Sequence, residues 1–315
     1  MTGDPATAPP NGRTFVHEAL LYRGRGELER SVRDFMREAA DAGEPVLAAL
    51  PRTSLEWLRD VVGGGPTEVR FEDMSEIGRN PSRLLPLYQD WITDRSGHGH
   101  VISEPMWPGR SYAETAECLR HEALLNVALA SSGARILCPY DAANLEPEVL
   151  VGAELTHPHV RDASGSRPSE RFADPIELSR GDNWPQQPPA HPVSEHRFGG
   201  DLRSLRRTIV NDPCLGGLSR ERRDDVVFVI NEAATNVVKH ADGTCTTRLW
   251  NDGLTVVAEV SSGSALPDVL AGRRRPAPEA PAGRGLWLIN QVCDLVELRS
   301  GDAGTTLRMH LRDAA

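Results

Sequence analysis

Short apolar runs alternate with longer amphipathic segments over the first half of the chain. Runs rich in Val, Leu, Ile and Ala, typical of buried strands, occupy residues 45–50, 68–71, 100–103 and 135–138. Helical spacing of apolar residues covers 27–42, 54–62, 82–93 and 112–130. Two of these helices start at a capping box, formed by Thr53 with Glu56 and by Ser111 with Glu114. The alternation predicts an α/β domain with a mainly parallel sheet.

The second half carries a different pattern, centred on the run INEAATNVVKH at 230–240. On a helical wheel one broad apolar arc holds Val226, Ile230, Ala233, Ala234, Val237 and Val238. Glu232, Asn236 and His240 fall together on another arc, so they border the core without belonging to it. Further on, the pattern predicts a strand at 254–260, a helix at 285–298 and a last strand at 304–311.

A proline-rich segment separates the two halves. Residues 161–195 contain six prolines and little apolar periodicity, which is typical of a linker. The first dozen residues have no pattern of either kind and indicate a disordered tail at 1–12. We therefore expect one domain at 13–160 and a second at 196–315.

Composition narrows the class of protein. With 35 basic and 45 acidic residues the formal charge is −10, which argues against non-specific binding to DNA or to an anionic membrane. The start of the chain lacks the basic and apolar regions of an export signal. Five scattered cysteines without a CxxC pair fit reduced thiols. These features predict a cytoplasmic protein.

Polar and aromatic residues follow three of the predicted parallel strands, where ligands collect in such sheets. This set comprises Arg79, Asn80, Glu104, Trp107, Arg110, Tyr140 and Asp141. They could form one pocket for a small polar ligand, or they could be ordinary turn and rim residues. The segment ALPRTSLEWL, which continues from the first predicted strand at 45–50, lacks the glycines and lysine of a phosphate loop, which argues against a P-loop nucleotide site. The neighbours His121 and Glu122 point about 100° apart on a helix, which favours structural roles.

The motifs FVHEALLY, IGRNPSRLLP, EPMWPGRS, RHEALLN and LCPYD, in this order, resemble the MEDS sensory domain of bacterial regulators. The resemblance covers almost all of residues 13–160. It implies a ligand-sensing α/β module that is related to RecA-like folds without their ATP loop. It adds His17 and His121 to the candidate ligand pocket.

The order of elements at 196–315 resembles the GHKL ATPase fold, an α+β sandwich, and within it the small anti-sigma-factor serine kinases. A glycine-rich turn that opens a helix is by itself weak evidence for an anion site. Moved onto matching positions, the family pattern makes Asn236 the Mg²⁺ ligand and Glu232 the base that activates a substrate hydroxyl. It assigns Gly283, Gly285 and Leu286 to the glycine box beside the triphosphate of ATP, and Thr305 and Thr306 to the strand near the adenine.

One departure from this pattern concerns the adenine. The family reads the adenine amino group with an aspartate in a DxGxG box, whereas this chain has SSGSALPD, with Ser261 and Ser262 at the expected place and the next aspartate at Asp268. Loss of a charge-assisted contact costs on the order of 1.5 to 3 kcal/mol. That is roughly a 10- to 150-fold loss of affinity, so the sequence predicts weak or lost ATP binding.

Two classes of function follow from the resemblance. In the first, the second domain binds a sigma factor or a STAS-type anti-sigma antagonist under control of the sensory domain, with little phosphorylation. In the second, it is an active serine/threonine kinase on such an antagonist, using Mg²⁺ and ATP. A sensor histidine kinase is disfavoured because the proline-rich segment cannot form a phosphoacceptor helix hairpin, and a metabolic enzyme because the first half has no nucleophile motif. Related kinases dimerise through their ATPase domains, which predicts a homodimer.

Overall fold

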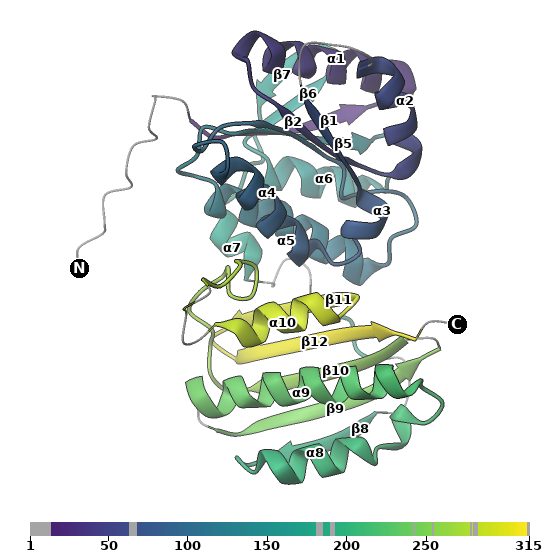
Figure 1. Ribbon diagram of the computed structural model, residues 1–315, viewed down its shortest axis with the longest axis vertical. Coiled ribbons are helices and arrows are strands. Elements are labelled where there is room, and N and C mark those ends of the chain that lie inside the picture. The colour runs from purple at the N-terminus through teal and green to yellow at the C-terminus, as the bar shows by residue number, and fades with distance from the viewer. Residues whose placement is uncertain are drawn as a thin grey trace, which may run out of the picture. The chain divides into compact units, whose positions relative to one another are not determined.

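The chain folds into two compact units, Met1–Ser179 and Arg180–Ala315. The computed structural model describes residues 14–62, 68–180, 185–189, 193–241, 243–253, 255–277, 279 and 283–313. The tail predicted at 1–12 lies outside these residues. The N-terminal unit and the C-terminal unit are described separately below (Figure 1).

The N-terminal unit is built on a seven-stranded sheet with the order β3-β2-β4-β5-β1-β6-β7. The first six strands in this order are parallel, and β7 runs antiparallel to β6. The strands are β1 (Val16–Tyr22), β2 (Val46–Leu50), β3 (Val69–Asp73), β4 (His100–Ser103), β5 (Arg135–Asp141), β6 (His159–Asp162) and β7 (Gly165–Pro168). The predicted α/β class with a mainly parallel sheet is confirmed.

Helices cover both faces of this sheet (Figure 1). They are α1 (Arg25–Ala42), α2 (Arg52–Val62), α3 (Met74–Ile77), α4 (Leu84–Thr93), α5 (Tyr112–Ala128), α6 (Pro147–Thr156) and α7 (Pro175–Ser179), with a 3₁₀ turn η1 (Pro81–Arg83). The capping box of Ser111 and Glu114 opens α5 as predicted. Helix α2 begins at Arg52, so Thr53 lies inside its first turn and does not precede it. Helices α1 and α2 bury their apolar side chains with β1, β2, β4 and β5 in one core.

The strand β1 lies between β5 and β6, although the hydrophobic pattern did not predict it. Its sequence VHEALLY places His17 and Glu18 in a buried strand, which interrupts the apolar run. Glu18 accepts a hydrogen bond from the Arg161 guanidinium at 2.7 Å and another from the Ser166 hydroxyl. These partners belong to β6 and β7 at the end of the sheet. Their hydrogen bonds offset the free-energy cost of burying the Glu18 carboxylate.

Residues 161–179, which the sequence analysis assigned to the linker, belong instead to the N-terminal unit. The hairpin of β6 and β7 extends the sheet, and α7 contacts α5. Asp174 caps α7 by accepting hydrogen bonds from the backbone N–H groups of Ile176 and Glu177. Local hydrogen bonds of polar side chains stabilise this segment. The hydrophobic pattern of the sequence therefore does not predict that it is folded.

The C-terminal unit is a five-stranded antiparallel sheet with the order β11-β12-β10-β9-β8 and helices packed on one face (Figure 1). The strands are β8 (Ser194–Phe198), β9 (Cys245–Asp252), β10 (Thr255–Ser262), β11 (Leu295–Gly301) and β12 (Gly304–Arg312). The helices are α8 (Leu202–Val210), α9 (Arg220–His240) and α10 (Arg284–Val292), with a 3₁₀ turn η2 (Pro213–Leu215). This arrangement confirms the predicted α+β sandwich.

The helix predicted at 285–298 is too long. Helix α10 ends at Val292, Cys293 has an extended backbone, and Leu295 begins β11, which pairs with β12. A short apolar run fits a buried strand and a buried helix equally well, and here its backbone bonds go to the neighbouring strand.

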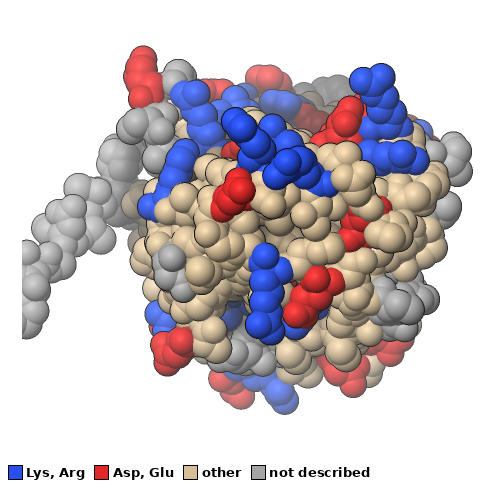
Figure 2. All heavy atoms as spheres, turned by 90° about the horizontal axis from the view of Figure 1, so that it is seen from below, with Lys and Arg blue, Asp and Glu red and all other residues tan. Residues whose placement is uncertain are grey.

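On the side of the C-terminal unit that carries α8, basic and acidic side chains are interspersed (Figure 2). The outward side of α8 includes the exposed Arg203, Arg206 and Arg207. In the described ranges, no helix is both long and apolar enough to cross a membrane.

Helix α6 approaches α5 closely at Gly152, and this contact generates a stability prediction. A Cβ at Gly152 would lie 2.7 Å from one terminal carbon of the buried Leu119. Gly152→Val should therefore destabilise the N-terminal unit by about 1 to 3 kcal/mol through overpacking. The matched control is Gly26→Val in α1, where a Cβ would meet only the end of the Arg30 side chain at 3.7 Å. Denaturant unfolding of the full chain should show a lower midpoint for Gly152→Val alone; equal shifts would contradict the close approach.

Candidate functional site

Helix α9 carries the two polar residues that the sequence singled out. Ser219 caps the helix, with its hydroxyl oxygen accepting from the Arg222 N–H at 3.2 Å. The apolar arc is buried in the core as predicted, except for Val238, whose side chain is 40% exposed. Glu232 and Asn236 are half-buried at the edge of that core, and His240 is exposed.

The beginning of α10 lies directly against Glu232 and Asn236. Gly283, the residue before the helix, has a left-handed backbone with φ of 89°. A Cβ at Gly285 would lie 3.0 Å from both amide atoms of Asn236 and 3.1 Å from Glu232 Oε2. Glycine at this position therefore allows the N-terminus of α10, with its N–H groups and positive end of the helix dipole, to approach the two side chains.

A cavity of about 600 Å³ opens beside this contact. Its walls come from α9, β10, α10, β12 and the segment that follows β10. Of the predicted site residues, it is lined by Asn236, Ser262, Gly283, Leu286 and Thr305. The structure therefore brings together residues that are up to 69 positions apart in the sequence, between Asn236 and Thr305.

The two predicted threonines of β12 separate. Thr305 lines the cavity, whereas the Thr306 hydroxyl lies 3.2 Å from the Ser261 hydroxyl. Successive side chains of a strand point to opposite faces, so only one member of each pair can face the cavity. Thr306 therefore does not lie in the predicted adenine site. Of the two serines, Ser262 is the one that faces the cavity.

The side chains at the β10 end of the cavity are already engaged. The Thr305 hydroxyl donates to the Ser264 carbonyl at 2.8 Å, and the Ser300 hydroxyl oxygen accepts from the Leu266 N–H at 2.6 Å. These bonds tie the turn after β10 to β11 and β12. Of the described residues that line the cavity, Asp268 is the one acidic residue, and it forms an ion pair of 3.9 Å with Arg274.

The same segment is also fastened to α10. The Asn290 side chain donates to the Gly272 carbonyl at 3.1 Å. Gly272 has a φ of 75°, and a Cβ there would lie 2.8 Å from the Leu286 Cβ. Leu270 is buried. The chain after β10 thus packs on α10 through a close approach that glycine permits.

The end of the cavity at Asn236 and the start of α10 offers groups that would fit Mg²⁺ and a polyphosphate. The amide nitrogen of Asn236 is buried and has no hydrogen-bond partner in the described structure. The two amide atoms are distinguished only by their partners, so either of them can face the cavity. An unpartnered buried amide beside a carboxylate and a helix N-terminus is the arrangement that a bound cation and anion would complete.

The pocket predicted in the N-terminal unit is divided between the two faces of the sheet. Glu104 accepts hydrogen bonds from Tyr22 at 3.2 Å and from Ser54 of α2 at 3.3 Å, on the face that α1 and α2 cover. Tyr140 is buried on the opposite face, where its ring meets that of His157 edge-on at 5.6 Å. Because side chains alternate along a strand, residues that follow neighbouring strands need not share a face. Glu104 and Tyr140 therefore do not line one cavity.

The other predicted residues of this pocket have separate contacts. The Arg110 guanidinium stacks on Trp107 at 3.5 Å and donates to the carbonyls of Pro105 and Gly78. Asp141 and Asn80 accept hydrogen bonds from backbone N–H groups of the turns that follow them. Arg79 is exposed, and His121 is buried against Tyr88 with ring centroids 5.9 Å apart. Glu122, which is adjacent to His121 in the chain, contacts His17. His121 and Glu122 therefore face different groups, as their positions on the helix predict.

Comparison with known proteins agrees with the two units. The family described as "MEDS: MEthanogen/methylotroph, DcmR Sensory domain" matches residues 16–158, and the family described as "Histidine kinase-like ATPase domain" matches residues 200–311. The chain joins a MEDS domain to a histidine kinase-like ATPase domain.

Among solved structures, the chain is similar to the RsbU and RsbW domains of Rv1364c from Mycobacterium tuberculosis, with 17% identity and a TM-score of 0.30. That match covers 40% of this chain and spans 33% of the other, and at this TM-score it does not bear on function. No curated protein matches the chain.

Glu104 in the MEDS domain generates a prediction about pH. Burial, together with the charge of Asp141, raises the pKa of Glu104 from 4.5 to about 8, against the opposing effect of hydrogen bonds from Tyr22 and Ser54. Below pH 4.5 the Glu104 carboxyl is protonated in both the folded and the unfolded chain, and its contribution to the free energy of unfolding is at its maximum. Between pH 4.5 and 8 only the folded chain holds it, so stability should fall as the pH rises, by up to about 4 kcal/mol.

Glu104→Gln should remove this dependence of stability on pH, because glutamine does not titrate. It also keeps the size of the protonated acid and can form similar hydrogen bonds. The measurement is the thermal midpoint of the full chain and of the variant at intervals from pH 5 to pH 8. A difference between the two midpoints that stays constant with pH would contradict a raised pKa.

Proposed function

We propose that this protein is a signalling regulator whose ATPase-like domain binds a sigma factor or a STAS-type anti-sigma antagonist. Its MEDS domain controls that binding in response to a small ligand, and its own phosphorylation activity is weak or absent. The observation that carries the proposal is the composition of the cavity at its β10 end. There Ser262 stands where an aspartate would read the adenine, and the Thr305 hydroxyl is bonded to Ser264.

The loss at this end is chemical as well as steric. A serine hydroxyl offers no anionic acceptor to the adenine amino group, and a site that hydrogen-bonds a ligand discriminates poorly once that acceptor is gone. The turn after β10 is tied to β11 and β12 through Leu266 and Thr305, and to α10 through Gly272. An adenine would have to displace this anchored segment or fit beside it.

The phosphate end supports a different conclusion. Glu232, Asn236 and the N-terminus of α10 lie together, as Mg²⁺ and phosphate binding require. Bound Mg²⁺ would neutralise charge on the phosphates of ATP, with Asn236 as its protein ligand. Glu232 is then the residue that would accept the proton of an attacking hydroxyl. This end is suited to transient contact with phosphate groups without selection for adenine.

A second candidate function, an active serine/threonine kinase on a STAS-type antagonist, is favoured by three charged residues of the cavity. Asp268 lines the cavity and could supply the carboxylate that Ser262 lacks. Arg274 and Arg275 line it as well and could neutralise phosphate charge. The ion pair between Asp268 and Arg274 at 3.9 Å competes with this use of the carboxylate, which is why we place the kinase second.

The proposed partners are proteins, with a small molecule in the MEDS domain. The net charge of −10 disfavours direct contact with DNA. The homodimer expected from the sequence stays a prediction, as does the cytoplasmic location.

Nucleotide affinity distinguishes the two functions. Calorimetric titration of the full chain with ATP and Mg²⁺ should show no saturation up to about millimolar nucleotide, and the thermal midpoint should not rise, because a ligand that binds the native state must stabilise it. Ser262→Asp should strengthen binding by about 10- to 150-fold through the restored charge-assisted contact. Asn236→Ala should change little in the parent chain.

The control for this experiment is Asp268→Asn. If Asp268 replaces the missing carboxylate, the parent chain will bind ATP at micromolar concentration and Asp268→Asn will weaken that binding. This outcome would contradict the first function and support the kinase. Ser261→Asp is the matched variant at the neighbouring position. The Ser261 side chain lies on the sheet face away from the cavity, where it hydrogen-bonds to Thr306, so an aspartate there should not improve ATP binding.

Partner binding is tested by recovering the tagged full chain from the cells that produce it and identifying bound proteins by mass spectrometry. We expect a sigma factor or a STAS-domain protein, whose direct binding is then measured with the purified components. Recovery of neither class, or failure of the purified pair to associate, would contradict the regulator even if ATP binding is weak.

A further inference from the structure

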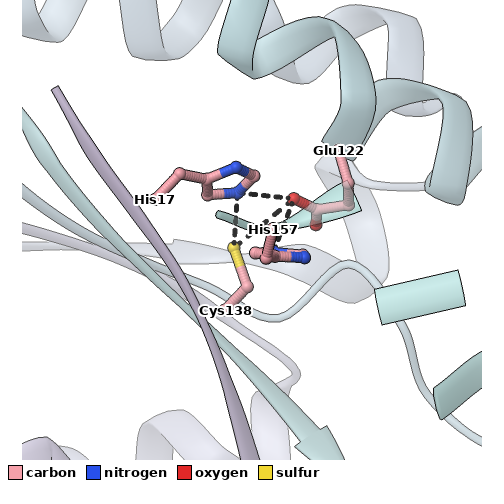
Figure 3. Close-up of side chains that lie close together, drawn as sticks. All are labelled: His17, Glu122, Cys138 and His157. Carbon is pink, nitrogen blue, oxygen red and sulfur yellow. Dashed lines mark hydrogen bonds and ion pairs between the residues drawn. The ribbon is translucent and has the colours of Figure 1, made fainter. Parts of the chain in front are cut away.

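Four side chains that can bind metal ions meet in the core of the MEDS domain (Figure 3). They are His17 of β1, Glu122 of α5, Cys138 of β5 and His157, which follows α6. All four are buried, and their nitrogen, oxygen and sulfur atoms lie within 4.8 Å of one another. Glu122 Oε2 lies 3.0 Å from His17 Nε2, 3.4 Å from His157 Nε2 and 3.5 Å from Cys138 Sγ.

The hydrogen on His17 is placed by its neighbour Asn126. The Asn126 Nδ2 group lies 2.8 Å from the Thr156 carbonyl and within 3.3 Å of the carbonyls of Glu122 and Ala123, so this end of the amide must be the donor. Its Oδ1 atom then accepts from His17 Nδ1 at 3.1 Å. In the neutral ring, His17 Nε2 is therefore a bare lone pair that points at Glu122 and Cys138.

The same argument applies to His157. Its Nδ1 lies 2.8 Å from the Ala153 carbonyl, which can only accept, so Nδ1 carries the hydrogen. Its Nε2 faces Glu122 at 3.4 Å and has no hydrogen-bond partner in the described part of the chain. Two ring lone pairs and a carboxylate oxygen thus converge, and the Cys138 thiol lies 3.5 Å from that oxygen.

Converging acceptors repel one another unless a cation lies between them. A proton shared within the cluster is one such cation, and a divalent metal ion is another. Two neutral imidazoles, one carboxylate and one thiolate carry two negative charges, so a divalent ion would make the buried cluster neutral overall.

Four of the six ligand–ligand separations are close to those of a tetrahedral site. With the usual zinc bond lengths, neighbouring nitrogen and oxygen ligands are about 3.3 Å apart, and a sulfur is about 3.6 Å from either. The observed 3.0 and 3.4 Å for the Glu122–imidazole pairs, and 3.5 Å from Cys138 Sγ to both Glu122 Oε2 and His17 Nε2, lie close to these values. Histidine ligands of metals commonly donate their other N–H to a carbonyl or side-chain oxygen, as His17 and His157 do here.

We propose that the MEDS domain of this protein binds one zinc ion through His17 Nε2, His157 Nε2, Cys138 Sγ and a carboxylate oxygen of Glu122. Borderline nitrogen, oxygen and thiolate donors in a closed four-coordinate set suit Zn²⁺. When the ion enters, the Cys138 thiol loses its proton to solvent and the sulfur–zinc bond forms, with no change in oxidation state. The site joins β1, α5, β5 and the end of α6, so metal content would set the stability of the sensory domain independently of the function proposed for the other domain.

The test uses the full chain, stripped with a chelator and reloaded with Zn²⁺ or Co²⁺. We expect about one metal ion per chain by elemental analysis, release of about one proton per ion, and a higher thermal midpoint. Cobalt should give thiolate-to-metal charge-transfer absorption and the visible bands of a tetrahedral site. If the chain holds no stoichiometric zinc or cobalt, the cluster is a proton-shared ion pair and the proposal is wrong.

Two variants and a matched control locate the site. Cys138→Ser should abolish the charge-transfer band and weaken zinc binding by at least about tenfold, and Glu122→Gln should weaken it while the band persists at high cobalt concentration. Cys118→Ser is the control, because Cys118 is equally buried in the same domain but its sulfur bonds to the Pro105 carbonyl. A band that survives Cys138→Ser, or one that only Cys118→Ser removes, would overturn the proposal. Circular dichroism checks folding, and if Cys138→Ser does not fold, the parent cobalt spectrum and Glu122→Gln decide.

Discussion

The interior strand β1 is subject to one constraint on both of its faces: a polar atom inside the protein must have a partner. The strand carries two adjacent polar side chains, and they point to opposite sides of the sheet. Glu18 reaches Arg161 and Ser166, whereas His17 reaches Asn126 and Glu122. The hairpin of β6 and β7 supplies the partners of Glu18. Helix α5 supplies the partners of His17. An apolar β1 would have required neither set of partners.

The sequence predicts the elements whose apolar pattern is regular and fails where buried polar residues interrupt it. Strand β2 is apolar throughout, β4 and β5 have apolar residues at their centres, and the last strand, β12, also appears where the pattern predicts it. Strand β1 was not predicted because His17 and Glu18 resemble surface residues in a one-dimensional pattern. Helix α10 was extended into β11 because Leu295, Val296 and Leu298 continue an apolar run whose hydrogen-bond partners lie in another segment. Local periodicity carries no information about such partners.

The candidate sites show the same limit. The spacing of Glu232 and Asn236 on one helix places them together from the sequence alone. Their contact with Gly285 depends on tertiary packing and was expected only from the resemblance to a family. In the MEDS domain, the predicted pocket assumed that residues after neighbouring strands share a face, and Glu104 and Tyr140 do not. His17, Cys138 and His157 come together from distant segments without any spacing signature, which is why residue counting could not find their cluster.

The anchored segment after β10 has a consequence for timing. The Leu266 N–H donates a hydrogen bond to Ser300, the Asn290 side chain donates one to the Gly272 carbonyl, and Gly272 packs closely on Leu286. Local opening of this segment must break those bonds, so the frequency of opening is set by them and by the packing of Gly272 on α10. Leu286 of α10 and Gly283 before it also line the cavity, so a displacement of α10 would change the cavity wall and the segment together. We therefore expect the segment, the start of α10 and the cavity wall to move as one unit.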